Sequence, residues 1–311
     1  MIGQGLIKDI RFFTKNFGIV NAYRFRVRPL LGRLGFHDNY SELQNTAFLQ
    51  FLNKQLAPVI TEYKYRDFVG KPISGDAPIW VCWWQGEANM PSLVKQCYKL
   101  LLKNSNGHPV ILIDETNYHN YVELPDIILR KVSESKITIT HLSDILRVSL
   151  LAKHGGLWID STYWCIKPLD IVGDVFYTLK QENINTNQIA RCRWMGACIG
   201  GDSSFALFSF LRDCLYLYWQ KNDALIEYFL LDYLMDIAYN EYSDIKRIID
   251  NNPCRCPDLH IMKRIFNMTF QSDTMQQYEL DNCMFKLSWK EKYKMLDSDN
   301  NKTYYNYFMS L

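Results

Sequence analysis

One segment of the chain, residues 141–160, combines a helix, a glycine pair, a short strand and an acid. Its first half reads HLSDILRVSLLAKH, in which apolar residues recur every three to four positions, as on one face of an α-helix. Gly155 and Gly156 follow, and a glycine after the last helical turn can adopt the left-handed conformation that ends a helix. Leu-Trp-Ile then predicts a buried strand, which ends at Asp160. An acid at the carboxyl end of a strand in an open α/β sheet points into the crevice where such sheets bind ligands.

The residues before this segment alternate strands and helices. Apolar runs predict strands at 79–84 and 109–114, with a helix at 90–103 between them. Helical segments within 117–133 and a strand near 137–140 complete the order β-α-β-(α)-β-α-β. Strands joined by helices pair in parallel, so the predicted class is α/β, with a mixed, mostly parallel central sheet flanked by helices. No GxGxxG follows the first strand, which argues against a Rossmann dinucleotide site.

The second half of the chain has a mixed pattern. It predicts two strands, at 175–179 and 194–199, and a turn at Gly200 and Gly201. Two helices are predicted to follow, at 203–219 and 223–239. The last of these helices is apolar nearly all round, yet it contains acids, among them Asp232. An acid inside an apolar helix must be paired or functional, so Asp232 is a candidate site residue.

A loop at 70–78, rich in glycine and proline, predicts a boundary between two parts of the chain. The first part, residues 1–75, is expected to be a helical N-terminal extension, and residues 76–311 an α/β domain. Its residues 1–36 contain most of the excess positive charge, with one acid, Asp9, against seven basic residues: Lys8, Arg11, Lys15, Arg24, Arg26, Arg28 and Arg33. Basic residues interleaved with aromatic ones suit a helix lying on an anionic membrane. A basic helix packed on its own domain, with its charges in water, explains the pattern equally well.

The composition excludes several classes of protein. With 48% hydrophobic residues the chain can bury a large core, and a formal net charge of +2 gives no argument for a nucleic-acid partner. No run of about 18 uncharged apolar residues occurs, and the N-terminus lacks a signal-peptide core, so we expect a cytoplasmic protein, peripheral at most on the inner face of the membrane. The nine cysteines are an odd number in apolar surroundings, which predicts reduced thiols. Cys254 and Cys256 have poor spacing for zinc.

Four segments together resemble a known family. They are WVCWWQG at 80–86, HLSDILRVSLLAKHGGLWIDST at 141–162, YFLLDYL at 228–234 and KLSWK at 286–290. In this order and spacing they are similar to the capsular polysaccharide synthesis family of bacterial glycosyltransferases, a branch of the group with a DXD sugar-binding region. The resemblance implies a GT-A-like fold and a hexosyltransferase that uses a nucleotide-sugar donor, such as a UDP-sugar. It also implies a glycan or lipid-linked oligosaccharide acceptor, a divalent cation (Mn²⁺ or Mg²⁺) and retention of anomeric configuration.

The same resemblance implies roles for individual residues. Trp84, and after it Trp83, would stack on the nucleotide base, although a core position suits one of the two. Asp144 and Arg147 would bind the donor sugar, the alternative being an ion pair within the helix. Asp232 could receive an acceptor or donor hydroxyl, or satisfy a group in the core.

The metal and the diphosphate have their own candidates. Asp160 matches the first acid of the DXD motif, but Thr162 occupies the place of the second acid, which weakens the metal assignment to Asp160 and Thr162. A C-terminal segment resembles the one that closes over the diphosphate, with the candidates Lys286, Ser288, Trp289 and Lys290. A surface strand with ordinary lysines explains Lys290 equally well.

Two other functions remain open from the sequence. An inactive relative could keep a nucleotide-sugar or glycan pocket and, without the second acid, transfer nothing. A glycoside hydrolase could use Asp144 and Asp160 as its carboxylate pair, but it would have no use for lysines that bind a diphosphate.

Overall fold

The structure is a computed structural model that describes residues 2–27, 41–181 and 188–311. Its centre is a five-stranded sheet in the order β2-β1-β3-β6-β5. The strands are β1 (Ile79–Cys82), β2 (Val110–Ile113), β3 (Gly156–Ile159), β5 (Phe176–Thr178) and β6 (Cys198–Gly201). Strand β1 pairs in parallel with β2 and β3, whereas β6 is antiparallel to both β3 and β5. Four strands therefore run in one direction and β6 runs against them, which confirms the predicted α/β class with a mixed, mostly parallel sheet.

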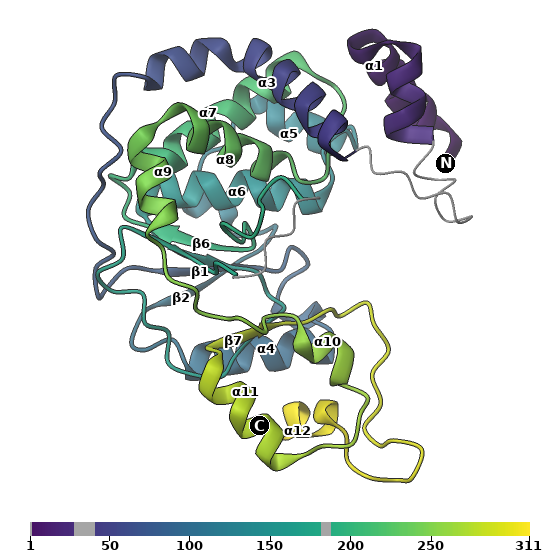
Figure 1. Cartoon of the computed structure of the whole chain (residues 1–311), viewed down its shortest axis with the longest axis vertical. Coiled ribbons are helices and arrows are strands. Elements are labelled where there is room, and N and C mark those ends of the chain that lie inside the picture. The colour runs from purple at the N-terminus through teal and green to yellow at the C-terminus, as the bar shows by residue number, and fades with distance from the viewer. Residues whose placement is uncertain (1, 28–40, 182–187) are drawn as a thin grey trace.

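A layer of helices covers one face of this sheet (Figure 1). It consists of α3 (Ser41–Tyr63), α5 (Asp126–Ser133), α6 (Ile139–His154), α7 (Ala206–Lys221), α8 (Leu230–Glu241) and α9 (Ser243–Asp250). Helix α6 packs along α7, and both contribute to the largest hydrophobic cluster together with Trp80 and Trp158 of the sheet. The side chain of Trp80 also donates its Nε1–H to the carbonyl of Gly155 at 2.8 Å, which ties β1 to the end of α6.

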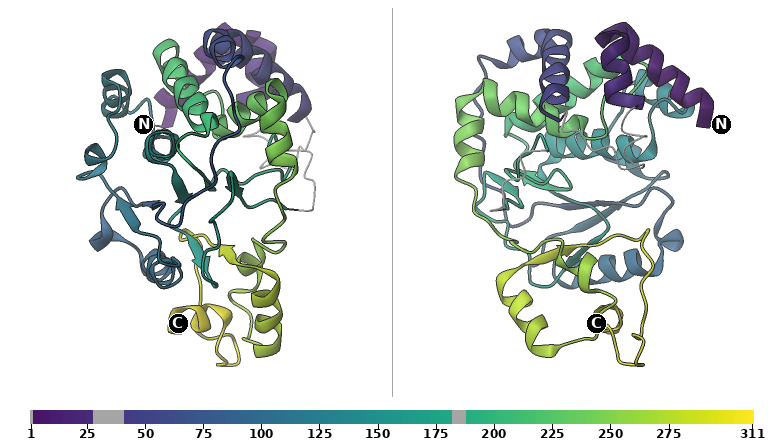
Figure 2. Two further views of the ribbon diagram at one scale, coloured as in Figure 1. Left: turned by 90° about the vertical axis from the view of Figure 1, so that its left-hand side faces the viewer. Right: turned by 45° about the vertical axis from the view of Figure 1, so that its right-hand side comes forward.

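The other face is covered by the C-terminal part of the chain and α4 (Figure 2). The elements there are α4 (Ser92–Lys103), β4 (Tyr163–Cys165), α10 (Ile261–Ile265), α11 (Ser272–Asp281), β7 (Met284–Lys286) and α12 (Tyr304–Ser310), with the short turns η2 (Glu87–Asn89) and η3 (Tyr118–Asn120) in the connecting loops. Strands β4 and β7 form a separate antiparallel pair, in which Tyr163 lies opposite Lys286. Trp164 packs between Phe285 and Phe308, so the C-terminal helix is held against this pair.

The N-terminal helices pack on the helical layer. They are α1 (Ile2–Ala22), which is interrupted at Gly18, and η1 (Tyr23–Val27). The buried ring of Phe13 lies 5.9 Å from that of Phe48 in α3, and Arg26 donates to the carbonyl of Ile226 at 2.6 Å. None of the described helices is long and apolar enough to cross a membrane. Two of the basic residues of the extension, Arg28 and Arg33, lie outside the described residues.

The glycine pair after α6 behaves as predicted. Helix α6 ends at His154, and Gly155 follows it with φ +67°. Gly156 begins β3 with φ +97°, and a Cβ atom there would come within 2.1 Å of the carbonyl oxygen of Pro78. Both the left-handed backbone and the close approach require glycine, so the helix can turn directly into the strand that ends at Asp160.

Several sequence-based predictions of secondary structure are wrong, and the strand predicted at 194–199 is found at Cys198–Gly201. Residues 137–140 form no strand, because Thr138 is the N-cap of α6 and its side chain accepts a hydrogen bond from the amide of His141. Gly200 and Gly201 lie inside β6 rather than in a turn. Glycine is needed at position 200 because a Cβ there would meet the Gly156 carbonyl oxygen at 2.6 Å. The helix predicted at 223–239 begins only at Leu230.

The late start of α8 has a local cause. The hydroxyl of Tyr218 donates to the carbonyl of Ala224 at 2.6 Å and accepts from the amide of Ile226 at 2.8 Å. These bonds satisfy the backbone of the loop before α8 in a non-helical form. The strand expected at 79–84 also ends earlier, at Cys82, so both Trp83 and Trp84 follow β1.

Candidate active site

Three parallel strands end at the same edge of the sheet. The chain runs from β1 to β2 on one side and later returns to β3 on the other side of β1. Trp80 of β1 pairs with Trp158 of β3, so the ends of these strands, at Cys82 and Asp160, lie level with each other. In open α/β sheets the crevice at such a switch point is where ligands bind.

Asp160 is the centre of a charged cluster at this edge. Its Oδ1 accepts hydrogen bonds from Arg147 Nη2 at 3.1 Å and from Trp158 Nε1 at 3.0 Å, and its Oδ2 accepts from Lys286 Nζ at 2.8 Å. Burial alone would raise the pKa of Asp160, but the charges of Lys286 and Arg147 outweigh it and lower the pKa to about 2. The carboxylate is therefore ionised across the physiological range.

Arg147 links two of the predicted site residues. Its Nη1 lies 3.0 Å from Asp144 Oδ1, while its Nη2 reaches Asp160. The guanidinium is buried over the ring of Trp158, and although burial would lower its pKa, the charges of Asp144 and Asp160 raise it. The structure thus joins Asp144, Arg147 and Asp160 into one row of alternating charge. The pair predicted to bind the donor sugar therefore contacts the acid predicted to match the first position of the DXD motif.

His141 extends this row, and sequence reasoning did not identify it. Its Nδ1 lies 3.4 Å from Asp144 Oδ2, and its Nε2 is 2.9 Å from the indole Nε1 of Trp219. An indole N–H can only donate, so Nε2 carries a lone pair and the ring proton belongs on Nδ1, facing Asp144. The spacing of three residues between His141 and Asp144 on one helix was the available sequence signal.

Asp232 and Arg147 both lie beside Gly196. A Cβ atom on Gly196 would be 3.4 Å from Asp232 Oδ1 and 3.8 Å from Arg147 Nη1. Trp194 donates its Nε1–H to Asp232 Oδ1 at 2.8 Å. Burial raises the pKa of Asp232 to about 6; the Trp194 hydrogen bond partly opposes this, and Asp144 adds to it. This acid therefore titrates near neutral pH, unlike Asp160.

The C-terminal segment reaches the site through the pairing of β7 with β4. Lys286 Nζ lies 4.5 Å from the centre of the Tyr163 ring as well as 2.8 Å from Asp160 Oδ2. Ser288 is half-buried, while Trp289 and Lys290 are exposed and stack loosely, with Lys290 Nζ 5.8 Å from the Trp289 ring. The four residues predicted to hold the diphosphate thus lie in or just after β7, the strand whose Lys286 bonds Asp160.

The two tryptophans after β1 have different surroundings. Trp83 meets Trp289 edge to face, with ring centroids 5.7 Å apart, so it joins the C-terminal segment. Trp84 instead lies 5.5 Å from Tyr118 and packs on the main hydrophobic cluster. Trp84 thus packs on the same hydrophobic cluster as Trp80 and Cys82, although it follows β1 in a turn. Trp83 is half-buried and Trp289 is 44% exposed, so Trp289 is the accessible member of this pair.

A family model described as capsular polysaccharide synthesis protein matches residues 33–308, which is most of the chain. The chain belongs to this family. No curated protein matches it. Among solved structures it is similar to one titled "PaToxG Glycosyltransferase", at 14% identity and a TM-score of 0.41, over 79% of this chain and 96% of that one. A likeness at this level says nothing about substrates.

The family match also bears on the N-terminal residues. It begins at residue 33 and so includes α3, whose Tyr63 donates a hydrogen bond to Asp213 of α7 at 2.6 Å. The segment pattern at 80–86, 141–162, 228–234 and 286–290, from which the family was predicted, lies wholly inside the matched range.

The donor atoms at Asp160 do not fit a divalent cation. A hard cation needs several oxygen ligands, yet both Asp160 oxygens are bonded to Arg147, Trp158 or Lys286. Within residues 2–27, 41–181 and 188–311, no group of three or more His, Cys, Asp or Glu could hold a metal ion. The cation predicted at Asp160 and Thr162 stays a prediction, and the ammonium of Lys286 is the group that contacts Asp160 Oδ2.

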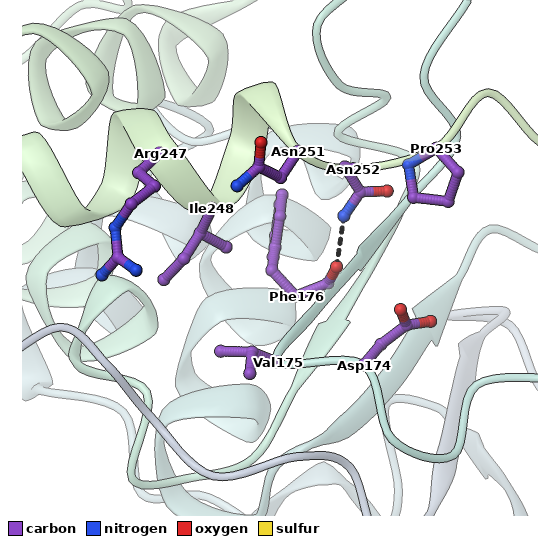
Figure 3. A pocket seen from close by; sticks show the side chains of 8 residues that line it. All are labelled: Asp174, Val175, Phe176, Arg247, Ile248, Asn251, Asn252 and Pro253. Atoms are coloured by element: carbon purple, nitrogen blue, oxygen red, sulfur yellow. Dashed lines mark hydrogen bonds between the residues drawn. The ribbon is translucent and has the colours of Figure 1, made fainter.

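A separate pocket lies away from this cluster, at the edge strand β5 and the end of α9 (Figure 3). Its lining includes Asp174, Phe176 and Asn252, and the Asn252 side chain donates to the Phe176 carbonyl. Asp174 is paired with Arg255 at 2.7 Å. None of the predicted site residues lines this pocket, and its polar groups are satisfied locally.

Proposed function

We propose that this member of the capsular polysaccharide synthesis family is a glycosyltransferase that moves a sugar from a nucleotide-sugar donor to a growing surface or capsular polysaccharide. The observation that carries the proposal is the Asp160 cluster: an ionised carboxylate at the switch point of the sheet, bonded to Arg147 and Lys286. The exposed Trp289 follows Lys286 by three residues and contacts the half-buried Trp83. A nucleotide sugar offers a flat base, hydroxyls and a diphosphate, and this cluster provides a partner for each.

The donor can be assigned to the site group by group. The indole faces of Trp83 and Trp289 suit the base, which we take to be uracil, and Asp160 can accept a hydrogen bond from a ribose hydroxyl. Asp144 and Arg147 lie deeper and can accept from and donate to the hydroxyls of the transferred hexose. Lys286, Ser288 and Lys290 lie in the segment that would contact the diphosphate.

In the transfer step, the bond between the sugar C1 and the diphosphate oxygen breaks and its electron pair leaves with the diphosphate. The acceptor hydroxyl oxygen forms the new bond to C1 on the same face, so the anomeric configuration is retained. The proton of this hydroxyl passes to the departing phosphate oxygen. The chain's part is to hold the two substrates and to stabilise the charge of the leaving group by positive side chains already in position. Asp232, which lies beside Gly196 as Arg147 does, can orient a hydroxyl of the donor or acceptor.

The acceptor that we propose is a glycan or lipid-linked oligosaccharide at the inner face of the cell membrane, and features of the N-terminal region support peripheral binding there. Ile19, Val20 and Tyr23 are 75%, 59% and 49% exposed, directly after the interruption at Gly18. Arg11 and Lys15 are exposed on the preceding part of α1. Apolar side chains next to basic ones suit the surface of an anionic bilayer.

Membrane binding is tested by cosedimentation with vesicles of phosphatidylcholine alone or with phosphatidylglycerol. We expect the protein to bind the anionic vesicles and the double variant Ile19→Ser, Val20→Ser to bind them at least fivefold more weakly. Equal binding of the variant and the parent would contradict the proposed contact.

The donor proposal is tested by thermal unfolding with a panel of nucleotide sugars, including UDP-, GDP- and dTDP-hexoses, with and without Mn²⁺. A ligand that binds only the native state raises Tm, so at least one donor should stabilise the parent and none should stabilise Asp160→Ala. If no donor shifts the Tm of the folded protein, the donor-binding proposal fails. Binding of a donor without any transfer to an acceptor would instead identify an inactive relative.

A further inference from the structure

We infer that this chain binds the diphosphate of its donor without a divalent cation, with the ammonium group of Lys286 providing the positive charge at Asp160. The inference rests on the proposed function and specifies how its diphosphate is held. It follows from the contacts of Lys286, from the state of both Asp160 oxygens and from the charge of the site.

Lys286 is held at Asp160 by the backbone. The pairing of β7 with β4 puts Lys286 opposite Tyr163, three residues after Asp160, and the amide of Leu287 donates to the carbonyl of Thr162 at 2.9 Å. The side chain of Lys286 is only 17% exposed, lies against the Tyr163 ring and ends 2.8 Å from Asp160 Oδ2. A lysine fixed in this way cannot leave for solvent without breaking these contacts.

An ammonium group in this position still has bonding capacity. It has three N–H donors, of which one goes to Asp160 and one faces the Tyr163 ring. The remaining donor can reach a phosphate oxygen. Asp160 thus orients Lys286 in the way that a carboxylate orients a metal ion in a metal-dependent site.

The charge of the site is consistent with this role. A divalent cation held by two carboxylates has no net charge, and Asp160 with Lys286 has none either. A divalent cation at Asp160 Oδ2 would have to displace Lys286 and would lie beside Arg147, which already bonds Oδ1. Two positive side chains on one carboxylate repel a third cation, and both carboxylate oxygens are already hydrogen-bonded.

In the reaction, Lys286 stays protonated throughout. The C1–O bond of the donor breaks, its electron pair goes to the phosphate oxygen, and the acceptor proton joins that oxygen. The ammonium stabilises the increase in negative charge on the diphosphate, and the exposed Lys290 can contribute from the same segment.

The test is calorimetric binding of UDP, GDP and dTDP to the full chain in EDTA and, separately, in Mn²⁺. At least one nucleoside diphosphate should bind in EDTA with a Kd within about threefold of its value in Mn²⁺. Lys286→Met should weaken this binding in EDTA at least tenfold, whereas Lys286→Arg, which keeps the charge, should weaken it less than threefold. The matched control is Lys292→Met, an exposed lysine of the same C-terminal segment, which should bind like the parent.

The outcomes separate the inference from the proposed function. Binding that requires Mn²⁺ and disappears in EDTA overturns the inference and leaves the glycosyltransferase proposal intact. No binding under either condition overturns the donor site itself. If Lys286→Met does not fold, electron paramagnetic resonance of Mn²⁺ on the parent decides: the protein with saturating UDP should immobilise no more Mn²⁺ than UDP alone, and a protein-bound Mn²⁺ signal would refute the inference.

Discussion

Asp232→Asn should change how the stability of this protein depends on pH. Asp232 has a pKa raised from 3.8 to about 6, chiefly by burial. Asparagine keeps an oxygen that can accept the 2.8 Å hydrogen bond from Trp194 Nε1, and it has no charge to bury. The substitution therefore removes the titration while it preserves the contact.

The size and sign follow from the shift. An acid whose pKa is higher in the folded state binds a proton more tightly there, so its stabilising contribution is complete below about pH 4 and is lost as the pH rises through about 6. A shift of about two units corresponds to about 3 kcal/mol, at 1.36 kcal/mol per unit. The side chain is partly exposed, and solvent screening reduces the expected loss to about 1–2 kcal/mol.

The assay is urea unfolding of the parent and of Asp232→Asn at a series of pH values from 4 to 8. The free energy of unfolding of the variant, relative to the parent, should rise by about 1–2 kcal/mol across this range. A control is Asp236→Asn, one turn later on α8, which removes an ion pair to Arg193 and should lower stability at pH 7. Parallel curves for the parent and Asp232→Asn, or a parent that gains on the variant with rising pH, would refute the reasoning.

Three further substitutions test other parts of the account. Gly156→Ala, at φ +97° and with a Cβ 2.1 Å from the Pro78 oxygen, should lower stability by at least about 2 kcal/mol in thermal unfolding. Gly75→Ala, where the added Cβ meets nothing within 4 Å, should lower it by less than about 1 kcal/mol. Equal losses in the two variants would contradict the role of the close approach. Arg147→Met leaves Asp144 and Asp160 without their shared partner and should lose about 3–5 kcal/mol in urea unfolding, an expectation that a loss below 1 kcal/mol would exclude. Trp289→Ala removes a side chain that is 44% exposed, so nucleotide affinity measured by calorimetry should fall about tenfold with little change in Tm, and an unchanged affinity would remove Trp289 from the base site.

Local sequence determined much of this architecture. The spacing within 141–160 predicted α6, the glycine stop, β3 and an acid at its end, and each of these is found in the structure. It succeeded because a helix stop and a strand end depend on backbone conformation within a few residues. The pairing of Asp144 with Arg147 is local in the same sense, being one helical turn.

The contacts that complete the site are not local. Lys286 reaches Asp160 across 126 positions because β7 pairs with β4, and no pattern within either strand specifies that register. The tryptophans Trp158, Trp194 and Trp219 are simple core residues by composition, yet each directs its indole N–H at a side chain of the site. Which of Trp83 and Trp84 faces the crevice depends on which side of β1 the helices cover. The sequence predicted a turn at Gly200, where the structure has a strand, because the close contact of Gly200 is with Gly156 of the neighbouring strand β3 and is not local in sequence.

The central claim is that the Asp160 cluster holds a nucleotide sugar for transfer. The most direct measurement is ³¹P NMR of the protein with UDP-, GDP- and dTDP-hexoses and a membrane fraction as acceptor, which follows release of the nucleoside diphosphate. The account predicts release by the parent from at least one donor and none by Asp160→Ala, with both proteins folded. Equal release by the two, or sugar liberated from the glycan with no nucleotide present, would contradict it.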